Sequence, residues 1–208
     1  MTQYGFYFDS TRCIGCKTCE IACKDYKELG PEILYRRIYD YEGGKWEDNG
    51  DGTWKTTAFV FHLALSCNHC DNPACVSNCP TGAMQKDEET GLVFTDRDVC
   101  IGCMSCQQAC PYDAPRLNEE LAIARKCDGC IARTKNDRKP ICVEACPMRA
   151  LEFDDIEVLR GKYGDCAQVD PMADPSTTGP NLVLKVPEFC RDASVMANVA
   201  LANETEVE

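Results

Sequence analysis

The sequence predicts an α+β fold built from two small modules, one inserted in the other, with hairpin insertions and an extended C-terminal tail. Three observations support this fold. Sixteen of the 18 cysteines in the 208 residues fall into four groups of four. The groups alternate between two spacings, as an internal duplication would produce. A hairpin pattern separates the second and third groups, and a hydrophobic content of 44% is enough for a buried core.

The cysteine spacing is that of an iron-sulfur protein. The first and third groups follow C-x2-C-x2-C-x3-C, the ligand run of bacterial ferredoxins. The second and fourth repeat this run with a longer middle gap, residues 71–74 and 131–141. The four groups are Cys13, Cys16, Cys19 and Cys23; Cys67, Cys70, Cys75 and Cys79; Cys100, Cys103, Cys106 and Cys110; and Cys127, Cys130, Cys142 and Cys146.

This spacing has a chemical reason. Three thiolates on a short loop can hold three corners of one cubane, while the fourth cysteine enters a helix and points to a second cubane. Gly15 and Gly102 let the backbone approach the clusters, and we expect Ile14 and Ile101 to cover them from water. Four-cysteine zinc sites are the alternative, since they also use C-x2-C pairs. Zinc is disfavoured, because a zinc site needs neither a third cysteine after two further residues nor a proline directly after the last cysteine.

The hairpin sets the predicted domains. Residues 84–96 have a turn-forming centre at 88–91 followed by a strand at 92–94. A hairpin between two cysteine runs is the arrangement of a bacterial 2x(4Fe-4S) ferredoxin, so groups two and three form one module, residues 57–111. Groups one and four then form the other, residues 1–56 and 112–165, and residues 166–208 are the tail.

The other segments are simpler. We predict strands at residues 4–8, 33–41 and 57–65, and a surface helix at 155–163 that ends near Gly164. The Gly- and Asp-rich stretch 43–52 is either a solvated loop or a partner contact. From residue 170 onward, prolines, small residues and an acidic end suit a tail that wraps a neighbour or a loose terminus. Cys166 and Cys190 are expected to be free thiols, with a mutual disulfide as the alternative.

Charge and motifs exclude several classes. A net charge of −12 argues against nucleic acid as a partner, and no apolar run reaches the 18 residues of a membrane span. Met1 is not followed by a secretory signal. No catalytic motif is present, so we predict a non-catalytic protein. His69 is expected to pack against or support a ligand. Candidates to offset the cluster charge are Arg12, Lys17, Lys24, Arg97, Arg125, Lys126 and Arg149.

Several stretches together resemble the iron-sulfur subunit of dimethyl sulfoxide reductase and its relatives, over roughly residues 1–165. These stretches are YGFYFDSTRCIGCKTCEIACKDY, SCNHCDNPAC, CIGCMSCQQACPYDAP, KCDGC and KPICVEACPMRAL. The resemblance implies a complex with a catalytic subunit that carries bis-molybdopterin guanine dinucleotide. It also implies an integral membrane anchor that oxidises quinol.

The resemblance also implies four ligand sets. These are Cys13, Cys16, Cys19 and Cys146; Cys23, Cys127, Cys130 and Cys142; Cys67, Cys70, Cys75 and Cys110; and Cys79, Cys100, Cys103 and Cys106. Some relatives lack a cysteine at the position of Cys103 and carry a three-iron cluster. Because Cys103 is present, we expect four 4Fe-4S clusters.

The expected function is therefore relay of single electrons between the anchor and the molybdopterin subunit, most simply of a reductase of S-oxides, N-oxides or another terminal acceptor. The alternatives are a free-standing polyferredoxin, or the electron-transfer subunit of a formate dehydrogenase-like or sulfur-compound reductase complex. We expect peripheral association with the membrane through partner subunits. Export with a partner that bears a twin-arginine signal, to the extracytoplasmic side, is favoured over a cytoplasmic location.

Overall fold

The structure is a computed structural model that describes residues 2–207. One three-stranded sheet has the order β10-β1-β11, with β1 antiparallel to β10 and parallel to β11. Its strands are β1 (Tyr4–Asp9), β10 (Leu151–Asp155) and β11 (Leu182–Lys185). Helix α6 (Ile156–Tyr163) packs on this sheet through Leu159, which is fully buried beside Tyr7 and Val183. The predicted strand at 4–8 and the predicted helix at 155–163 are confirmed, and Gly164 is the C-cap of the helix.

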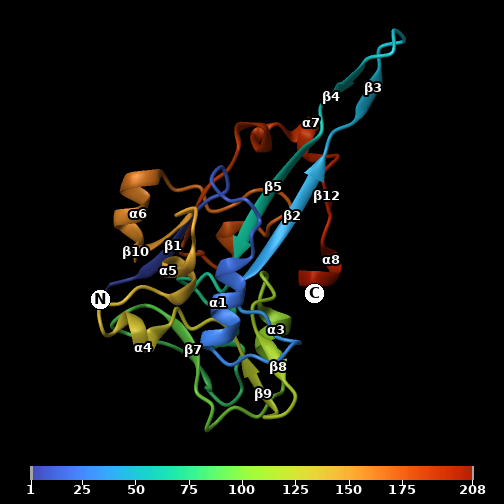
Figure 1. The fold of residues 1–208 in the computed structure, drawn as a ribbon. Coiled ribbons are helices and arrows are strands. Elements are labelled where there is room, and N and C mark those ends of the chain that lie inside the picture. The colour runs from blue at the N-terminus through green and yellow to red at the C-terminus, as the bar shows by residue number, and fades with distance from the viewer. Residues whose placement is uncertain (1, 208) are drawn as a thin grey trace.

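The second sheet extends into an arm that leaves the body of the molecule (Figure 1). It has the order β12-β2-β5, with β2 (Arg37–Gly43), β5 (Phe59–Leu65) and β12 (Ala200–Leu201). The predicted strand at 33–41 therefore begins four residues late. The stretch 43–52, predicted as a loop, contains the strand β3 (Trp46–Asp48), which pairs with β4 (Trp54–Thr56) to form the arm's own hairpin. Both tryptophans are about two-thirds exposed there.

Two smaller hairpins lie near the cysteine groups. Strands β6 (Met84–Lys86) and β7 (Val93–Thr95) pair antiparallel, which confirms the hairpin predicted at 84–96. Strands β8 (Arg116–Asn118) and β9 (Ile123–Arg125) form a second hairpin that the sequence analysis did not predict. The remaining helices are short: α1 (Thr18–Tyr26), α2 (Ala74–Ser77), α3 (Ser105–Ala109), α4 (Ile131–Thr134), α5 (Ile141–Ala145), α7 (Ala193–Met196) and α8 (Glu204–Val207), with 3-10 turns Pro175–Thr177 and Glu188–Arg191.

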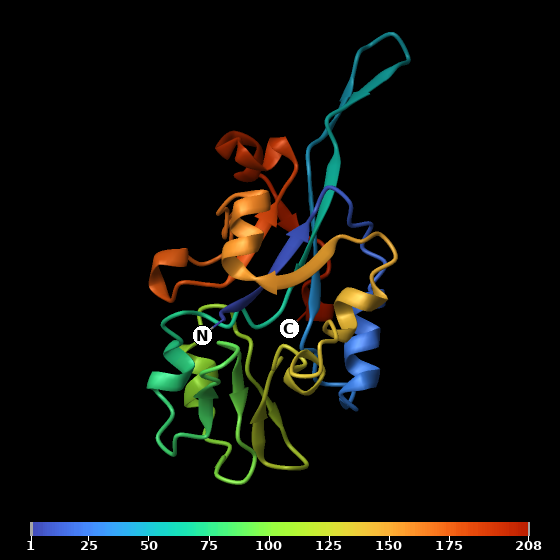
Figure 2. The ribbon, with the colours of Figure 1, turned by 90° about the vertical axis from the view of Figure 1, so that its left-hand side faces the viewer.

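The C-terminal segment is part of the fold, which corrects the prediction of an extended or loose tail. Strand β11 pairs with β1 in register from Phe6–Leu182 to Asp9–Lys185. Strand β12 and helix α8 pack against β2. Figure 2 shows the orange and red C-terminal segment lying beside the blue first strand. The composition of this segment gave no sign of a strand, because β11 has only four residues and three of them, Leu182 to Leu184, are apolar.

We expect Leu184→Ala to destabilise the protein, because Leu184 is only 2% exposed and packs in the main core. Removal of such a buried side chain costs about 2–5 kcal/mol. In a protein of this size that corresponds to a fall of roughly 4–20 °C in the unfolding midpoint. Val158→Ala, at an exposed position of α6, is the control. Equal midpoints for the two variants, followed by circular dichroism, would mean that the C-terminal segment is not held in the fold.

Candidate metal centres

Three cavities are each lined by four cysteines. The three cavities are similar in size. Their cysteines are Cys67, Cys70, Cys75 and Cys110; Cys13, Cys16, Cys19 and Cys146; and Cys79, Cys100, Cys103 and Cys106. Similar volume and an identical set of four sulfurs indicate that the same kind of group fits each cavity.

The remaining four cysteines of the runs, Cys23, Cys127, Cys130 and Cys142, form the fourth quartet. All four are buried. Burial raises the pKa of the Cys23 thiol strongly, and its neighbours Cys127, Cys142 and Cys130 raise it further. The four thiols therefore lie near one another in the interior. The structure thus brings together the same four quartets that the resemblance implies.

Helix geometry links neighbouring quartets. Cys19 and Cys23 lie one turn apart on α1, so both face the same side but belong to different quartets. Helix α1 packs against α5, which carries Cys142 and has Cys146 as its C-cap. In the other half, α2 packs against α3, which carries Cys106 and has Cys110 as its C-cap. Each helix pair therefore joins two quartets.

An apolar cluster joins the two helix pairs. It contains Cys23 and Cys127 from one quartet and Cys67 from another, with Cys110 packed against it. The quartets consequently follow one another in a row. The quartet that contains Cys13 comes first, followed by those that contain Cys23, Cys67 and Cys79. Cys16 at one end and Cys103 at the other are the exposed cysteines of the row.

Gly15 and Gly102 have left-handed backbones, with φ of 64° and 66°. A Cβ at Gly15 would lie 2.6 Å from the His62 ring, and one at Gly102 would lie 2.3 Å from the Ala122 carbonyl oxygen. Only glycine therefore allows these two cysteine loops to close.

Ile14 and Ile101 each line one of the cavities, which agrees with the prediction that they cover it from water. Their outer sides face solvent, because 60% and 64% of their surfaces stay exposed. The buried part of the walls is supplied by Phe8, Ile38, Ala83 and Met84. The two ends of the row therefore carry exposed apolar side chains.

Hydrogen-bond donors point at the sulfurs. The backbone N–H groups of Met84, Ala124 and Ala150 donate to the sulfurs of Cys79, Cys100 and Cys146 at 3.3–3.4 Å. The N–H of Gly129 donates to Cys127 Sγ at 3.4 Å. Such donors stabilise thiolates and are typical of iron-sulfur ligands, whose potentials they influence.

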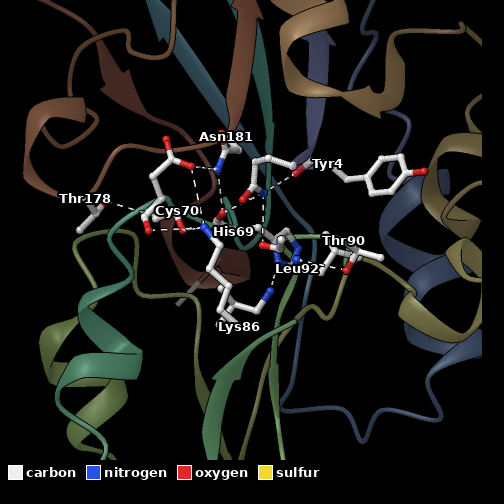
Figure 3. A network of polar contacts seen from close by, with 12 residues as sticks. Tyr4, His69, Cys70, Lys86, Thr90, Leu92, Thr178 and Asn181 are labelled. Carbon is white, nitrogen blue, oxygen red and sulfur yellow. Dashed lines mark hydrogen bonds and ion pairs between the residues drawn. The ribbon is translucent and has the colours of Figure 1, made fainter. Parts of the chain in front are cut away.

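One donor comes from the C-terminal segment. Thr178 is buried, and its hydroxyl donates to Cys70 Sγ at 3.2 Å, as Figure 3 shows. The loop before β11 is held beside Cys70 because the N–H of Asp71 donates to the Gly179 carbonyl. Thr178 was not predicted as a site residue, because no sequence motif connects it to a cysteine 108 residues away.

We expect Thr178→Val to lower the potential of the cluster that Cys70 would bind, because the variant keeps the side-chain shape and removes its donor. A net contribution of about 0.5–1.5 kcal/mol corresponds to roughly 20–65 mV. Potentiometric titration followed by EPR measures the shift. Thr178→Ser keeps the hydroxyl and is the control. A valine variant that titrates like wild type would exclude this role.

Burial keeps the free thiols protonated. It raises the pKa of Cys19, Cys75 and Cys130 to about 12, and that of Cys70 to about 11. Thiolates form at such sites when a bound cation compensates their charge. The buried quartets therefore suit metal ligation rather than free thiolate chemistry.

Two fully buried cations lie among the sulfurs. Burial alone would lower the pKa of Lys126, but Cys67, Cys75 and Cys127 raise it. The same balance acts on Arg36, whose pKa is raised by Cys142 and Cys19 against the effect of burial. Lys126 was one of the predicted cations. Arg36 was missed, because it is distant in sequence from every cysteine run.

One hydrogen-bond donor of Arg36, its Nε, is unpaired. Its terminal nitrogens donate to the Ala64 carbonyl at 2.7 Å and the Ser66 hydroxyl at 3.0 Å, and its guanidinium lies over the Phe6 ring. Within residues 2–207, the buried Nε has no hydrogen-bond partner. An unpaired buried donor is costly, so a sulfur-rich cluster beside it fits this site.

The other predicted cations serve local structure. Lys17 pairs with Glu206 and Asp40, and Lys24 donates to the carbonyls of Gly30 and Pro31. Arg12 lies 3.7 Å from Asp9, Arg149 donates to backbone carbonyls, and Arg97 lines a surface groove. Arg125 is buried over the Tyr35 ring. Cys166 is exposed, Cys190 is buried, and both are free thiols.

The sulfurs are arranged around cavities rather than around a point. Across residues 2–207, no three His, Cys, Asp or Glu side chains lie close enough together for one metal ion. Four sulfurs spread around a shared cavity are what a cubane of several metal atoms needs. The cavities thus favour iron-sulfur clusters over single zinc ions. In the same range, no helix has the length and apolar character to cross a membrane.

Comparison with known proteins agrees with this chemistry. A 4Fe-4S dicluster domain matches residues 58–156, and a 4Fe-4S binding domain matches residues 10–27. The sequence is 53% identical over 191 residues to the B subunit of the anaerobic dimethyl sulfoxide reductase of Haemophilus influenzae, a match that covers 92% of this protein and 93% of that one. It is 55% identical to the B subunit of the same reductase from Escherichia coli, covering 88% and 89%.

A more distant relative is the thiosulfate reductase electron transfer subunit of Salmonella typhi, 39% identical and covering 76% of this protein and 80% of that one. The domain matches define an iron-sulfur protein of the 4Fe-4S ferredoxin type. Together with the relatives, they show that this protein belongs to the family of iron-sulfur subunits of anaerobic dimethyl sulfoxide reductases.

Proposed function

We propose that this protein is an electron-transfer subunit that holds four 4Fe-4S clusters in a row. The observation that supports the proposal is that three cavities are each lined by four cysteines, while the four other cysteines of the runs lie near one another in the interior. Two helix pairs and one apolar cluster connect these four sets. The proposed ligand sets are those implied by the resemblance. When bound, each cluster supplies a site that gains and loses one electron.

Residues of the protein would offset the electrostatic repulsion between the clusters of such a row. Each oxidised cluster with its thiolates carries a charge of about −2, and these charges repel in a poorly solvated interior. Arg36 and Lys126 offset this repulsion at two places along the row. Backbone N–H groups that donate hydrogen bonds to the sulfurs stabilise the rest of the negative charge. The exposed ends at Cys16 and Cys103 are the points where electrons enter and leave.

We further propose two nested ferredoxin-like modules as the basis of the row. Residues 57–111 would form the inner module, and residues 1–56 and 112–165 the outer one. The packing of α1 on α5 and of α2 on α3 supports this division, because each pair gathers the cysteines of two groups. Residues 166–208 would serve the outer module as strand β11 and the inner one through Thr178.

The partners follow from the relatives. We propose a catalytic subunit with bis-molybdopterin guanine dinucleotide at one end of the row and a quinol-oxidising integral membrane anchor at the other. The names of the relatives support a reductase of S-oxides, with N-oxides or other terminal acceptors as related substrates. A sulfur-compound reductase complex is the second candidate, favoured by the thiosulfate reductase relative. The protein would be held at the membrane through these partners, on the extracytoplasmic side.

Two measurements test this function. Anaerobic affinity purification of the tagged protein from cells grown with dimethyl sulfoxide should bring down a large molybdenum-containing protein in equal amount. Redox titration monitored by EPR should then resolve clusters of different potential that interact magnetically. A protein that purifies alone with four isolated and indistinguishable clusters would be a free polyferredoxin, which contradicts the proposal. A stoichiometric 3Fe-4S signal in fresh protein would contradict the cluster type.

A further inference from the structure

His69 lies at the junction between the two halves of the row. It is fully buried and precedes Cys70 in the second cysteine group. Its Nδ1 lies 4.0 Å from Cys67 Sγ, and its Nε2 lies 4.0 Å from Cys127 Sγ. These two sulfurs belong to different quartets. One imidazole ring therefore bridges the second and third quartets, where the row passes from one helix pair to the other.

Hydrogen bonding fixes which ring nitrogen carries the proton. The backbone N–H of Val93 donates to Nδ1 at 2.9 Å, so Nδ1 must be an unprotonated acceptor. Val93 is itself held by its pairing with Lys86 in the β6-β7 hairpin and by Lys126, which donates to its carbonyl. The proton is consequently on Nε2, the nitrogen that faces Cys127. At 4.0 Å the contact is at the long end for a ring N–H and a sulfur.

The backbone at this residue is also clamped from outside. His69 has a left-handed φ of 46°, which turns its side chain into the junction. Its carbonyl accepts from Asn181 Nδ2 at 2.9 Å and from Gln3 Nε2 at 3.4 Å. Figure 3 shows these contacts around His69, with Asn181 on one side and Lys86 on the other. Segments near both termini and the central hairpin thus fix one ring orientation.

Resting on the proposed function, we propose that His69 tunes the relay at this junction by donating its Nε2–H to Cys127. A hydrogen bond to a ligand sulfur stabilises the reduced, more negative cluster and so raises its potential. The other ring nitrogen, Nδ1, is unprotonated and therefore cannot donate a hydrogen bond to Cys67. His69 therefore acts on the cluster held by Cys23, Cys127, Cys130 and Cys142 and distinguishes it from its neighbour at Cys67.

The test is redox titration of His69→Leu, followed by EPR, in the purified complex. We expect the ratio of reduced to oxidised Cys127 cluster, at a fixed potential, to fall about tenfold, which is 59 mV for one electron. The potentials of the two terminal clusters should not change. His69→Gln keeps a donor and an acceptor on a flexible side chain, and it should recover most of the wild-type potential.

Leu92→Ala is the packing control, because Leu92 is fully buried at the same junction and donates nothing from its side chain. It should change the potential much less than His69→Leu. The proposal is overturned if all four potentials shift together, if none shifts, or if the glutamine variant behaves like leucine. Iron analysis of the wild type and of each variant distinguishes these results from failure of the proposed function. If the proposed function is wrong, the wild-type protein itself lacks the clusters.

A second measurement needs no variant at position 69. The protein has 2 histidines, so labelling with ¹⁵N-histidine marks His69 and His62 alone. Pulsed EPR of the reduced wild-type protein should show a ¹⁵N coupling at the Cys127 cluster, and His62→Asn should leave it unchanged. Absence of that coupling, or its loss in the His62 variant, would contradict a contact between His69 and this cluster.

Discussion

Arg36→Met should lower the potentials of the two clusters proposed for the outer module, those at Cys19 and at Cys23. Arg36 is buried, and the charges of Cys142, Cys19, Cys127 and Cys23 raise its pKa. The attraction between two charges several ångströms apart in a protein is about 1.5–3 kcal/mol, which corresponds to roughly 65–130 mV for one electron. The reduced clusters lose most because they carry the extra negative charge. EPR-monitored titration would record the change.

Arg37→Met is a matched control, because Arg37 is equally buried but binds the carbonyls of Tyr112, Asp113 and Val207 instead of facing a quartet. We expect Arg37→Met to destabilise the fold without selective change of any potential. Arg36→Lys keeps the positive charge, so its cluster potentials should lie closer to those of the wild type than the potentials of Arg36→Met do. If Arg36→Met and Arg37→Met give the same potentials, the buried guanidinium does not compensate cluster charge.

Cys23→Ala should interrupt the row. Cys23 belongs to the second quartet and is buried beside Cys127, so its loss should remove one interior cluster. Iron should then fall by about a quarter, since four clusters share it equally. In the proposed complex, electrons from quinol should then no longer reach the catalytic subunit, although dithionite should still reduce the terminal clusters. Quinol-driven and dithionite-driven substrate reduction by the purified complex measure the two routes.

Cys190→Ala is the control for Cys23→Ala, because Cys190 is buried but lies outside the four quartets. It should keep full iron and both activities. Equal quinol-driven activity in Cys23→Ala and wild type would show that electrons do not pass through this quartet.

Local pattern predicted much of this molecule, and long-range contacts account for the rest. The C-x2-C-x2-C-x3-C spacing is enough to indicate the cluster type. The expected placement of the ligands needs one correction, because the third cysteine of each of these runs, Cys19 or Cys106, already lies on the helix and not on the loop before it. The hairpin at 84–96 and helix α6 were likewise predicted from local turn and cap residues. Arg36 and Thr178 could not be found this way, because each meets its sulfurs only after distant segments have packed together.

The C-terminal segment shows the same limit. Its small residues and prolines give no sheet pattern, yet β11 is held by a parallel pairing with β1 that no local propensity encodes. The exposed positions of Ile14 and Ile101 were also unpredictable from an apolar side chain next to a cysteine, because exposure depends on the side of the loop that faces the body.

The most direct test of four iron-sulfur clusters is a paired assay of iron and acid-labile sulfide on intact, anaerobically purified protein. Four cubanes require about sixteen of each per polypeptide. A colourless protein with zinc in its place, or iron and sulfide near half of that amount, would contradict the row of four clusters.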